Sequence, residues 1–238
     1  NHPVVQVETC DMKPAIRKLY DEFAQRGIIE LEQGFLEAAN AGVNAIRCRQ
    51  IMGHPDTFGL AKPDELTGKD EHMMIHVDNH VETGERLVIF AALIPEQERI
   101  YRLLLKKGLK VALINGTISG PERQRIDKDF REGRYQFIVG SAATMGVGFN
   151  WPFLNMVLFA SLDYGDDSFT QAYKRAIRSK REKALLVIVL SYRDSIDQKI
   201  FEAVERKAKD YNTIDETKPE IFLKAEKEVK KNGKLSMG

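Results

Sequence analysis

The chain has 238 residues, which suffices for one well-buried core with an appendage or a second small domain. Its 36 basic and 35 acidic residues leave a formal net charge of +1, so any surface that binds nucleic acid must be a local one. No apolar run is long enough to cross a bilayer and no signal-peptide pattern opens the chain, so we expect no membrane partner. The two cysteines, Cys10 and Cys48, make no disulfide framework, which favours a reducing compartment.

The first third of the chain has the periodicity of helices. Apolar residues at 3.6-residue spacing predict helical structure over residues 13–52, interrupted at Gly27 and Gly42. After a polar loop, the same spacing predicts a further helix over about 69–82.

From residue 86 short apolar runs alternate with amphipathic helices. The expected strands are 87–93, 111–114, 137–139, 156–160 and 185–190. The expected helices are 96–107, 121–131, 168–178 and 194–211. Such alternation is typical of a parallel sheet covered on both faces, so we predict an α/β, RecA-like fold preceded by a helical protrusion.

Composition divides the chain into three parts. We predict a helical protrusion and linker over 1–84 and a RecA-like domain over 85–211. The remaining residues, 212–238, form a charged tail with few aromatics.

Two glycines in the run Ser141 to Asn150 allow two interpretations. Gly146 and Gly148 either mark a tight turn after a strand, or let backbone amides approach an anion closely. In the second case the hydroxyls of Ser141 and Thr144 are additional donors.

The run Gln171 to Arg178, with the sequence QAYKRAIR, places Arg175 and Arg178 on one face of an expected helix. The two guanidinium groups can converge on one anion and suit the charge of a transferring phosphoryl group. A charge run of this kind, taken alone, is more often a solvated helix face, so its meaning depends on the neighbouring motifs.

A third candidate is Gly116-Thr117, which follows an expected strand at the point where open α/β sheets bind ligands. Arg123, in the helix behind it, either contacts phosphate or is an ordinary surface arginine.

Two kinds of site are missing or disfavoured. The Gly68-Lys69 and Gly233-Lys234 pairs lack the spacing of a phosphate-binding P-loop, and no acidic pair ends an apolar strand to hold magnesium. His72, His76 and His80 recur at four-residue spacing and could bind zinc, but the spacing also fits a polar helix face, and we expect no metal site.

In this order the motifs resemble the second motor domain of superfamily-two helicases, most closely the Snf-type DNA translocases of chromatin remodelling. The resemblance covers most of residues 1–205. Its blocks are Arg47–Pro55 ("LRQI..HP"), Arg86–Phe90 (motif IV), Asn115–Phe130 ("G.T...R....F"), Ser141–Asn150 (motif V), Gln171–Arg178 (motif VI) and the weaker Ser195–Ile200 ("T.EE.I").

The resemblance implies a role for each motif. Arg175 and Arg178 would be arginine fingers that reach the γ-phosphate of ATP, while the ATP and its Mg²⁺ are held mainly by the N-terminal RecA-like lobe. Residues on the nucleotide side would be Gln171, Gly146, Gly148 and Asn150. The residues that contact the backbone of double-stranded DNA would be Gly116, Thr117, Arg123, Ser141 and Thr144.

The sequence departs from the family pattern twice, once within motif VI and once directly after it. Lys174 stands where the family has glycine, and Ser179-Lys180-Arg181 replaces its "GQ" continuation. Lys174 either crowds the turn or adds a phosphate contact.

We therefore expect the C-terminal motor lobe of an ATP-dependent double-stranded DNA translocase, located in the cytoplasm or nucleus. Because the chain starts without methionine and with mid-motor motifs, we expect a fragment that is inactive alone. The alternatives are a lobe of a strand-separating superfamily-two DNA or RNA helicase, and a catalytically silent nucleic-acid-binding module. A P-loop and a DExx box upstream of this chain would exclude the last alternative.

Overall fold

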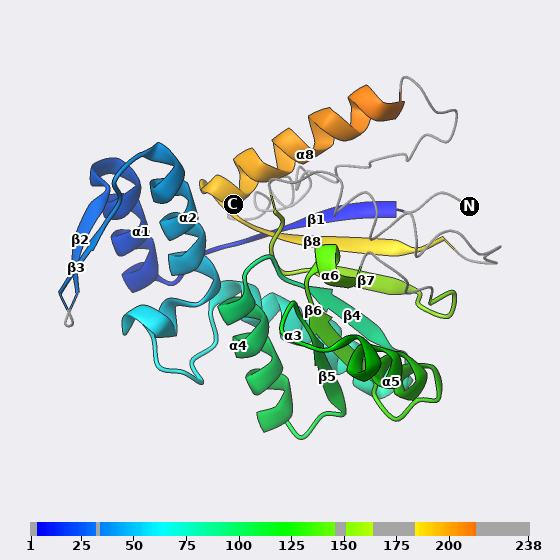
Figure 1. Ribbon diagram of the computed structural model, residues 1–238. Coiled ribbons are helices and arrows are strands. Elements are labelled where there is room, and N and C mark those ends of the chain that lie inside the picture. Colours follow the sequence, from blue (N-terminus) through cyan, green and yellow to red (C-terminus); the bar gives the residue numbers. More distant parts are fainter. Residues whose placement is uncertain (1–3, 32–33, 146–150, 164–183, 213–238) are drawn as a thin grey trace, which may run out of the picture.

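A six-stranded parallel sheet forms the centre of the molecule (Figure 1). The computed structural model describes residues 4–31, 34–145, 151–163 and 184–212. In spatial order the strands are β1 (Val4–Cys10), β8 (Leu186–Tyr192), β7 (Met156–Phe159), β4 (Leu87–Phe90), β6 (Phe137–Gly140) and β5 (Val111–Ile114). Their pairing is parallel throughout.

Helices cover both faces of this sheet. They are α3 (Gly68–Thr83), α4 (Ile94–Lys106), α5 (Gly120–Arg131), the short α6 (Ala142–Met145) and α8 (Ile196–Asn212). Along β4, Leu87 and Ile89 join a core that includes residues of α3 and α4, whereas Val88 and Phe90 join a core that includes residues of α5 and α8. The alternation explains why the strand is apolar at every position and confirms the predicted RecA-like α/β class.

The protrusion differs from the continuous helical segment expected over 13–52. It consists of α1 (Pro14–Arg26), an antiparallel hairpin of β2 (Ile28–Leu31) and β3 (Gly34–Glu37), and α2 (Ala41–Gly53), followed by the 3₁₀ turn η1 (Pro55–Phe58). Gly27 ends α1 in the left-handed conformation, with φ of 70° and its amide bonded to the Phe23 carbonyl. The helical expectation was wrong over the hairpin, which extends beyond the two helices in Figure 1.

Strand β1 was not predicted from the sequence. It pairs with β8 in parallel from Val4↔Leu186 to Cys10↔Tyr192 and forms one edge of the sheet. The expected domain boundaries stay predictions, but β1 and α3 both precede residue 84 and pack in the sheet layer rather than in the protrusion.

The other expected elements are found within a few residues of their predicted ends. The strand expected over 87–93 is β4, which ends at Phe90 because the chain then turns into α4. The expected helix 168–178 and the tail 213–238 lie outside the described residues. In the described part of the chain, Cys10 and Cys48 are buried free thiols and no helix is long and apolar enough to span a bilayer.

A buried ion pair fixes the start of α3. Thr67 and Asp70 form a capping box, and the same Asp70 carboxylate accepts two hydrogen bonds from Arg99 of α4, at 3.0 and 2.7 Å. Arg99 is 1% exposed, so this pair is screened little by solvent. The capping carboxylate therefore links α3 to α4.

Gly68, the first residue of α3, lies against the turn that follows β1. A Cβ at this position would lie 2.0 Å from the carbonyl oxygen of Asp11, whereas a Cβ on Gly120, the first residue of α5, would meet nothing within 4 Å. We predict that Gly68→Ala lowers the free energy of unfolding by about 1–3 kcal/mol, because backbone must move to admit the methyl group. Gly120→Ala should be neutral or stabilising by up to about 1 kcal/mol.

Urea unfolding of the two variants beside the parent chain measures this difference. Equal stability of the two variants would contradict the close approach at Gly68.

Candidate nucleotide and nucleic-acid site

The parallel sheet gathers the candidate motifs at one edge, where the carboxyl ends of its strands lie. Strands β7, β4, β6 and β5 are neighbours in this order, so the segments that follow them leave the sheet side by side. Neighbouring strands lie about 4.8 Å apart, which brings the residues after β5 and β6 within reach of one extended ligand. Ligands bind at this edge in open α/β sheets.

After β5, a tight turn presents Gly116 and Thr117. The buried Asn115 side chain accepts hydrogen bonds from the Thr117 amide at 3.0 Å and from its hydroxyl at 2.6 Å. Gly116 and Thr117 are exposed, and the space beside Gly116 is open. The turn is therefore preorganised and accessible.

Arg123 supports the same turn from α5. Its Nε donates a hydrogen bond to the carbonyl of Ile118 at 2.9 Å, and its side chain is half-buried. Arg123 therefore holds the turn of Gly116 and Thr117, a contact that neither interpretation of the sequence included.

After β6, Ser141 and Thr144 bond to each other. The Ser141 hydroxyl donates to the Thr144 hydroxyl at 2.7 Å and accepts from the Thr144 amide at 3.0 Å. The two groups expected to bind an anion are thus together, and each fixes the orientation of the other. Gly146, Gly148 and Asn150, expected on the nucleotide side, lie outside the described residues.

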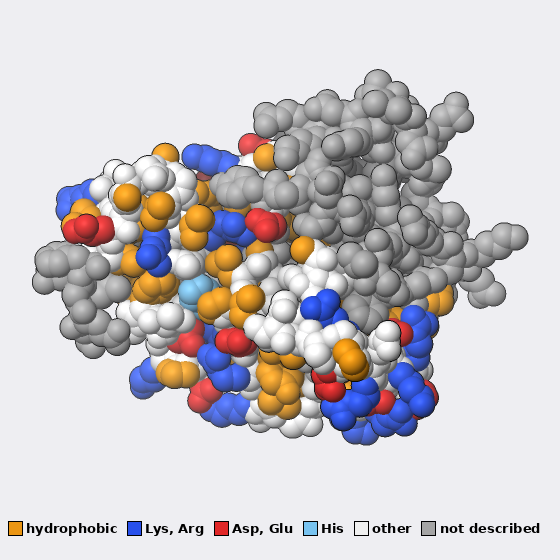
Figure 2. Space-filling model, viewed as in Figure 1, with side chains coloured by type: hydrophobic (Ala, Val, Ile, Leu, Met, Phe, Trp, Pro, Cys, Tyr) orange, Lys and Arg blue, Asp and Glu red, His pale blue; other side chains and the backbone are white. Residues whose placement is uncertain are grey.

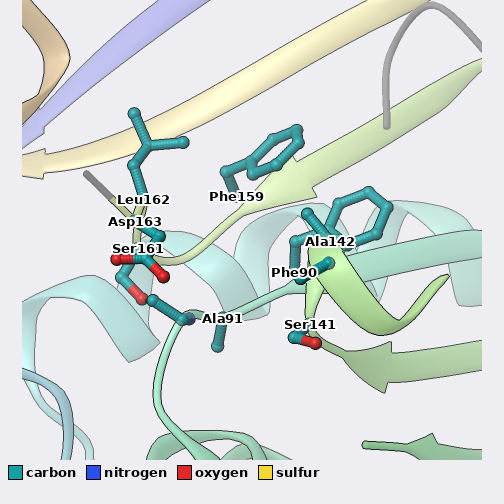
Figure 3. Close-up of a pocket in the computed structure, with 10 residues that line it drawn as sticks. Phe90, Ala91, Ser141, Ala142, Phe159, Ser161, Leu162 and Asp163 are labelled. Atoms are coloured by element: carbon teal, nitrogen blue, oxygen red, sulfur yellow. The ribbon is translucent and has the colours of Figure 1, made fainter. Parts of the chain in front are cut away.

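A cavity of about 100 Å³ lies between the segments that follow β4 and β6 and the end of β7 (Figure 3). Its walls come from three strand ends: Phe90, Ala91, Ala92, Ser141, Ala142, Ala143, Phe159, Ser161, Leu162 and Asp163. In Figure 3, Ser141 lies on one side of it, and Ser161 and Asp163 lie on the other. This volume is below the range of about 300–1,000 Å³ typical of small-molecule pockets, so it fits only part of a nucleotide.

The fingers expected in motif VI, Arg175 and Arg178, lie outside the described residues, as do Gln171 and Lys174. Their roles stay predictions. The described chain before them ends at Asp163, in the cavity wall.

Sequence reasoning missed a group of buried charged side chains next to the cavity. Lys69 pairs with Asp197 at 2.6 Å and donates to the carbonyl of Ala160 at 2.8 Å. Glu96 accepts a hydrogen bond from the Ser161 hydroxyl at 2.6 Å. Burial raises the pKa of Glu96, although Lys69 and the Ser161 hydroxyl favour the ionised form.

Sequence signals for this group were uneven. Asp197 belongs to the weakest motif block and Arg49, which also lies here, to the "LRQI..HP" block, so both could have been singled out. The only sequence feature that singles out Lys69 is the glycine before it, and no motif includes Glu96.

The histidines of α3 connect it to β1. His76 lies 2.9 Å and His72 3.6 Å from the carboxylate of Glu8. Burial raises the pKa of Glu8, but the hydrogen bond and charge of His76, and then those of His72, outweigh burial and lower the pKa overall. Among the residues that the structure describes, no group of His, Cys, Asp or Glu is arranged to hold a metal ion.

Basic side chains gather over α5, with acidic ones among them (Figure 2). The ion pairs on and beside this helix are Arg125–Glu122, Arg131–Asp127, Lys128–Glu132 and Arg134–Asp129. Because each of these four cations has an acidic partner within 4.0 Å, this part of the surface projects a weak field.

Comparison with known proteins agrees with the ordered motifs. Residues 69–180 match the family described as the helicase conserved C-terminal domain. The Arabidopsis thaliana protein CHROMATIN REMODELING 24 is 23% identical over 218 residues, which is 90% of this chain. The chain spans 20% of that relative's length and 11% of the length of a second curated relative.

Two solved structures share the fold. The C-terminal part of the Fun30 ATPase domain superposes with a TM-score of 0.69 at 16% identity, covering 85% of this chain and 89% of that one. The Sulfolobus solfataricus SWI2/SNF2 ATPase core in complex with double-stranded DNA gives a TM-score of 0.68 at 18% identity, covering 89% of this chain and 46% of that one. Together with the motif order, these matches support a C-terminal helicase lobe of the Snf type in superfamily two, and the two solved structures share its fold.

Proposed function

We propose that the chain is the C-terminal motor lobe of an ATP-dependent translocase on double-stranded DNA, and that it supplies half of the ATP site and part of the DNA track. One observation carries this proposal. The turn of Gly116 and Thr117 and the hydroxyl pair of Ser141 and Thr144 follow the neighbouring parallel strands β5 and β6. Ser141 also lines a cavity of about 100 Å³, which is large enough for part of a nucleotide.

ATP with Mg²⁺ is the proposed substrate, held mainly by an N-terminal RecA-like lobe. Lys69 is the lysine of one of the two Gly-Lys pairs, and it is committed to Asp197 and to the Ala160 carbonyl rather than to a phosphate. On this chain, Gln171, Gly146, Gly148 and Asn150 are the proposed nucleotide-side residues, and Arg175 and Arg178 the proposed fingers. The fingers would stabilise charge on the transferring phosphoryl group when the two lobes close.

The proposed DNA contacts are to phosphates. Exposed Gly116 and Thr117 offer backbone and hydroxyl groups, Arg123 and Ser141 lie beside them, and Thr144 completes the hydroxyl pair. Contacts of this kind fix position on the duplex and carry no base sequence. The likeness to a SWI2/SNF2 core solved with double-stranded DNA supports the choice of duplex DNA as the substrate. Such a motor would work in the cytoplasm or nucleus.

We predict that this chain alone hydrolyses no ATP above background, because the triphosphate cradle belongs to the other lobe. Phosphate release, measured with and without duplex DNA, tests this expectation. DNA-stimulated turnover that persists through repurification of the chain would overturn the half-site proposal.

DNA binding by this chain should be weak, with Kd in the range of about 10⁻⁶ to 10⁻⁴ M, indifferent to sequence and steeply dependent on salt. We expect Arg123→Ala to weaken binding and reduce the salt slope, because it removes one cation from the track. Arg125→Ala is the matched control on the same helix, since Arg125 is paired with Glu122 at 2.6 Å.

Titration of labelled duplexes at two salt concentrations gives both quantities. Salt-insensitive affinity, a strong sequence preference, or an effect of Arg125→Ala equal to that of Arg123→Ala would count against the proposed track.

In the intact motor, Arg175→Ala and Arg178→Ala should each remove most turnover, a loss of roughly 2–4 kcal/mol of transition-state stabilisation, while nucleotide affinity stays nearly unchanged. Arg178→Lys should also be strongly impaired, because lysine lacks the forked guanidinium. Lys174→Ala is the control and should be mild.

Steady-state ATPase beside nucleotide affinity distinguishes these outcomes. Damage by Lys174→Ala as severe as that by Arg175→Ala would show that the register assigned to motif VI is wrong.

A further inference from the structure

Three charged side chains from three different helices hold consecutive residues at the exit of β7. The β7 exit is defined here as residues 160–163, which follow the strand directly. Lys69 comes from α3, Glu96 from α4 and Arg49 from α2. The three helices are separate elements that all precede β7, so their convergence on four successive residues is a property of the fold.

Each side chain holds a different residue of the β7 exit. Lys69 Nζ donates to the Ala160 carbonyl at 2.8 Å, and Glu96 accepts from the Ser161 hydroxyl at 2.6 Å. Ser161 in turn accepts the Ala92 amide at 2.9 Å, which joins the β7 exit to the segment after β4.

Arg49 holds the last two residues. Its Nη2 donates to the Leu162 carbonyl at 3.0 Å and lies 3.4 Å from the Asp163 carboxylate. Because a carbonyl and a carboxylate share one guanidinium, the direction in which the chain leaves the sheet is fixed by α2.

The burial of these groups makes the arrangement rigid. Lys69, Glu96 and Arg49 are 6%, 3% and 9% exposed. Buried charges are costly unless their hydrogen bonds are satisfied, so displacement of one partner is strongly resisted. The carboxyl of Glu96 also lies against α2, because a Cβ on Gly53 would be 2.8 Å from its Cδ.

The β7 exit is also a wall of the cavity. Ser161, Leu162 and Asp163 line it opposite Ser141 (Figure 3). Helix α2 belongs to the protrusion and packs against α1, η1 and α8. A shift of α2 therefore moves Arg49 and with it the cavity wall.

We propose that Arg49 is a positioning residue that couples the protrusion to the cavity lined by Ser141, so that the position of α2 and the occupancy of that cavity depend on each other. The proposal rests on the proposed function, in which this cavity belongs to the motor's ligand site. Coupling between two sites is reciprocal, so ligand at the cavity must also change the order of α2.

The test uses the intact motor that contains this chain, with Arg49→Met, the conservative Arg49→Lys, and Arg47→Met as the matched control. Arg47 lies two residues away in α2 and bonds within the helix to Gln50 at 2.8 Å. The readouts are kcat and KM for DNA-stimulated ATP hydrolysis, and hydrogen exchange of residues 160–163 and of α2 with and without a nonhydrolysable ATP analogue and duplex DNA.

We expect Arg49→Met to lower kcat about tenfold with little change in KM, since misplacement of a site by a fraction of an ångström has effects of this order. Exchange at residues 160–163 should rise, and the ligand-dependent protection of α2 should disappear. Arg49→Lys should recover part of kcat and part of that protection. Arg47→Met should match the parent in every readout.

Three results would overturn the proposal: unchanged exchange at residues 160–163 in Arg49→Met, loss of kcat with the ligand-dependent protection of α2 intact, or equal effects of Arg47→Met. Should Arg49→Met not fold, an Arg49→Lys variant with parental kcat and parental α2 protection overturns it as well. If the parent motor hydrolyses no ATP, the proposed function fails. Hydrogen exchange still tests the coupling in that case. Protection of α2 that depends on both ligand and Arg49 supports the coupling, and the absence of such protection refutes it.

Discussion

Parallel pairing of all six strands in the main sheet is the constraint on which the rest of the structure depends. Each parallel connection needs a crossover, so helices cover both faces and every strand ends at the same edge. That edge brings together the turn after β5, the hydroxyl pair after β6 and the exit of β7, which are separated by up to about 45 residues in sequence. The candidate site is therefore a consequence of topology, to which each segment contributes one or two polar groups.

Buried charge supplies the second level of organisation. Asp70 and Arg99 join α3 to α4, and Lys69 and Asp197 join α3 to α8. Ion pairs of this kind contribute little net stability, because desolvation offsets much of the attraction, but they penalise any arrangement that separates the partners. In this lobe they fix the places where helices begin and where β7 ends, so the positions of the site residues are set by groups that are not themselves exposed at the site.

Sequence patterns predicted the sheet layer well and the protrusion poorly, for physical reasons. Strands such as 111–114 are apolar on both faces and are bounded by turn residues, which leaves few alternatives. Strand β1 has half-buried polar positions because it lies at the sheet edge, and it was missed. The hairpin of β2 and β3 carries apolar residues that also fit a helical period. Lys69 and Glu96 were missed because their convergence on residues 160–163 depends on three crossovers, which no local pattern encodes.

We propose that this lobe presents the carboxyl edge of its sheet to both nucleotide and duplex as half of a shared site. A structure of the intact protein with a nonhydrolysable ATP analogue and double-stranded DNA tests it most directly. We expect the γ-phosphate within hydrogen-bond distance of Arg175 or Arg178, and DNA phosphates at Gly116, Thr117 or Ser141. A nucleotide bound away from this edge, or a duplex on the opposite edge of the sheet, would contradict the shared site.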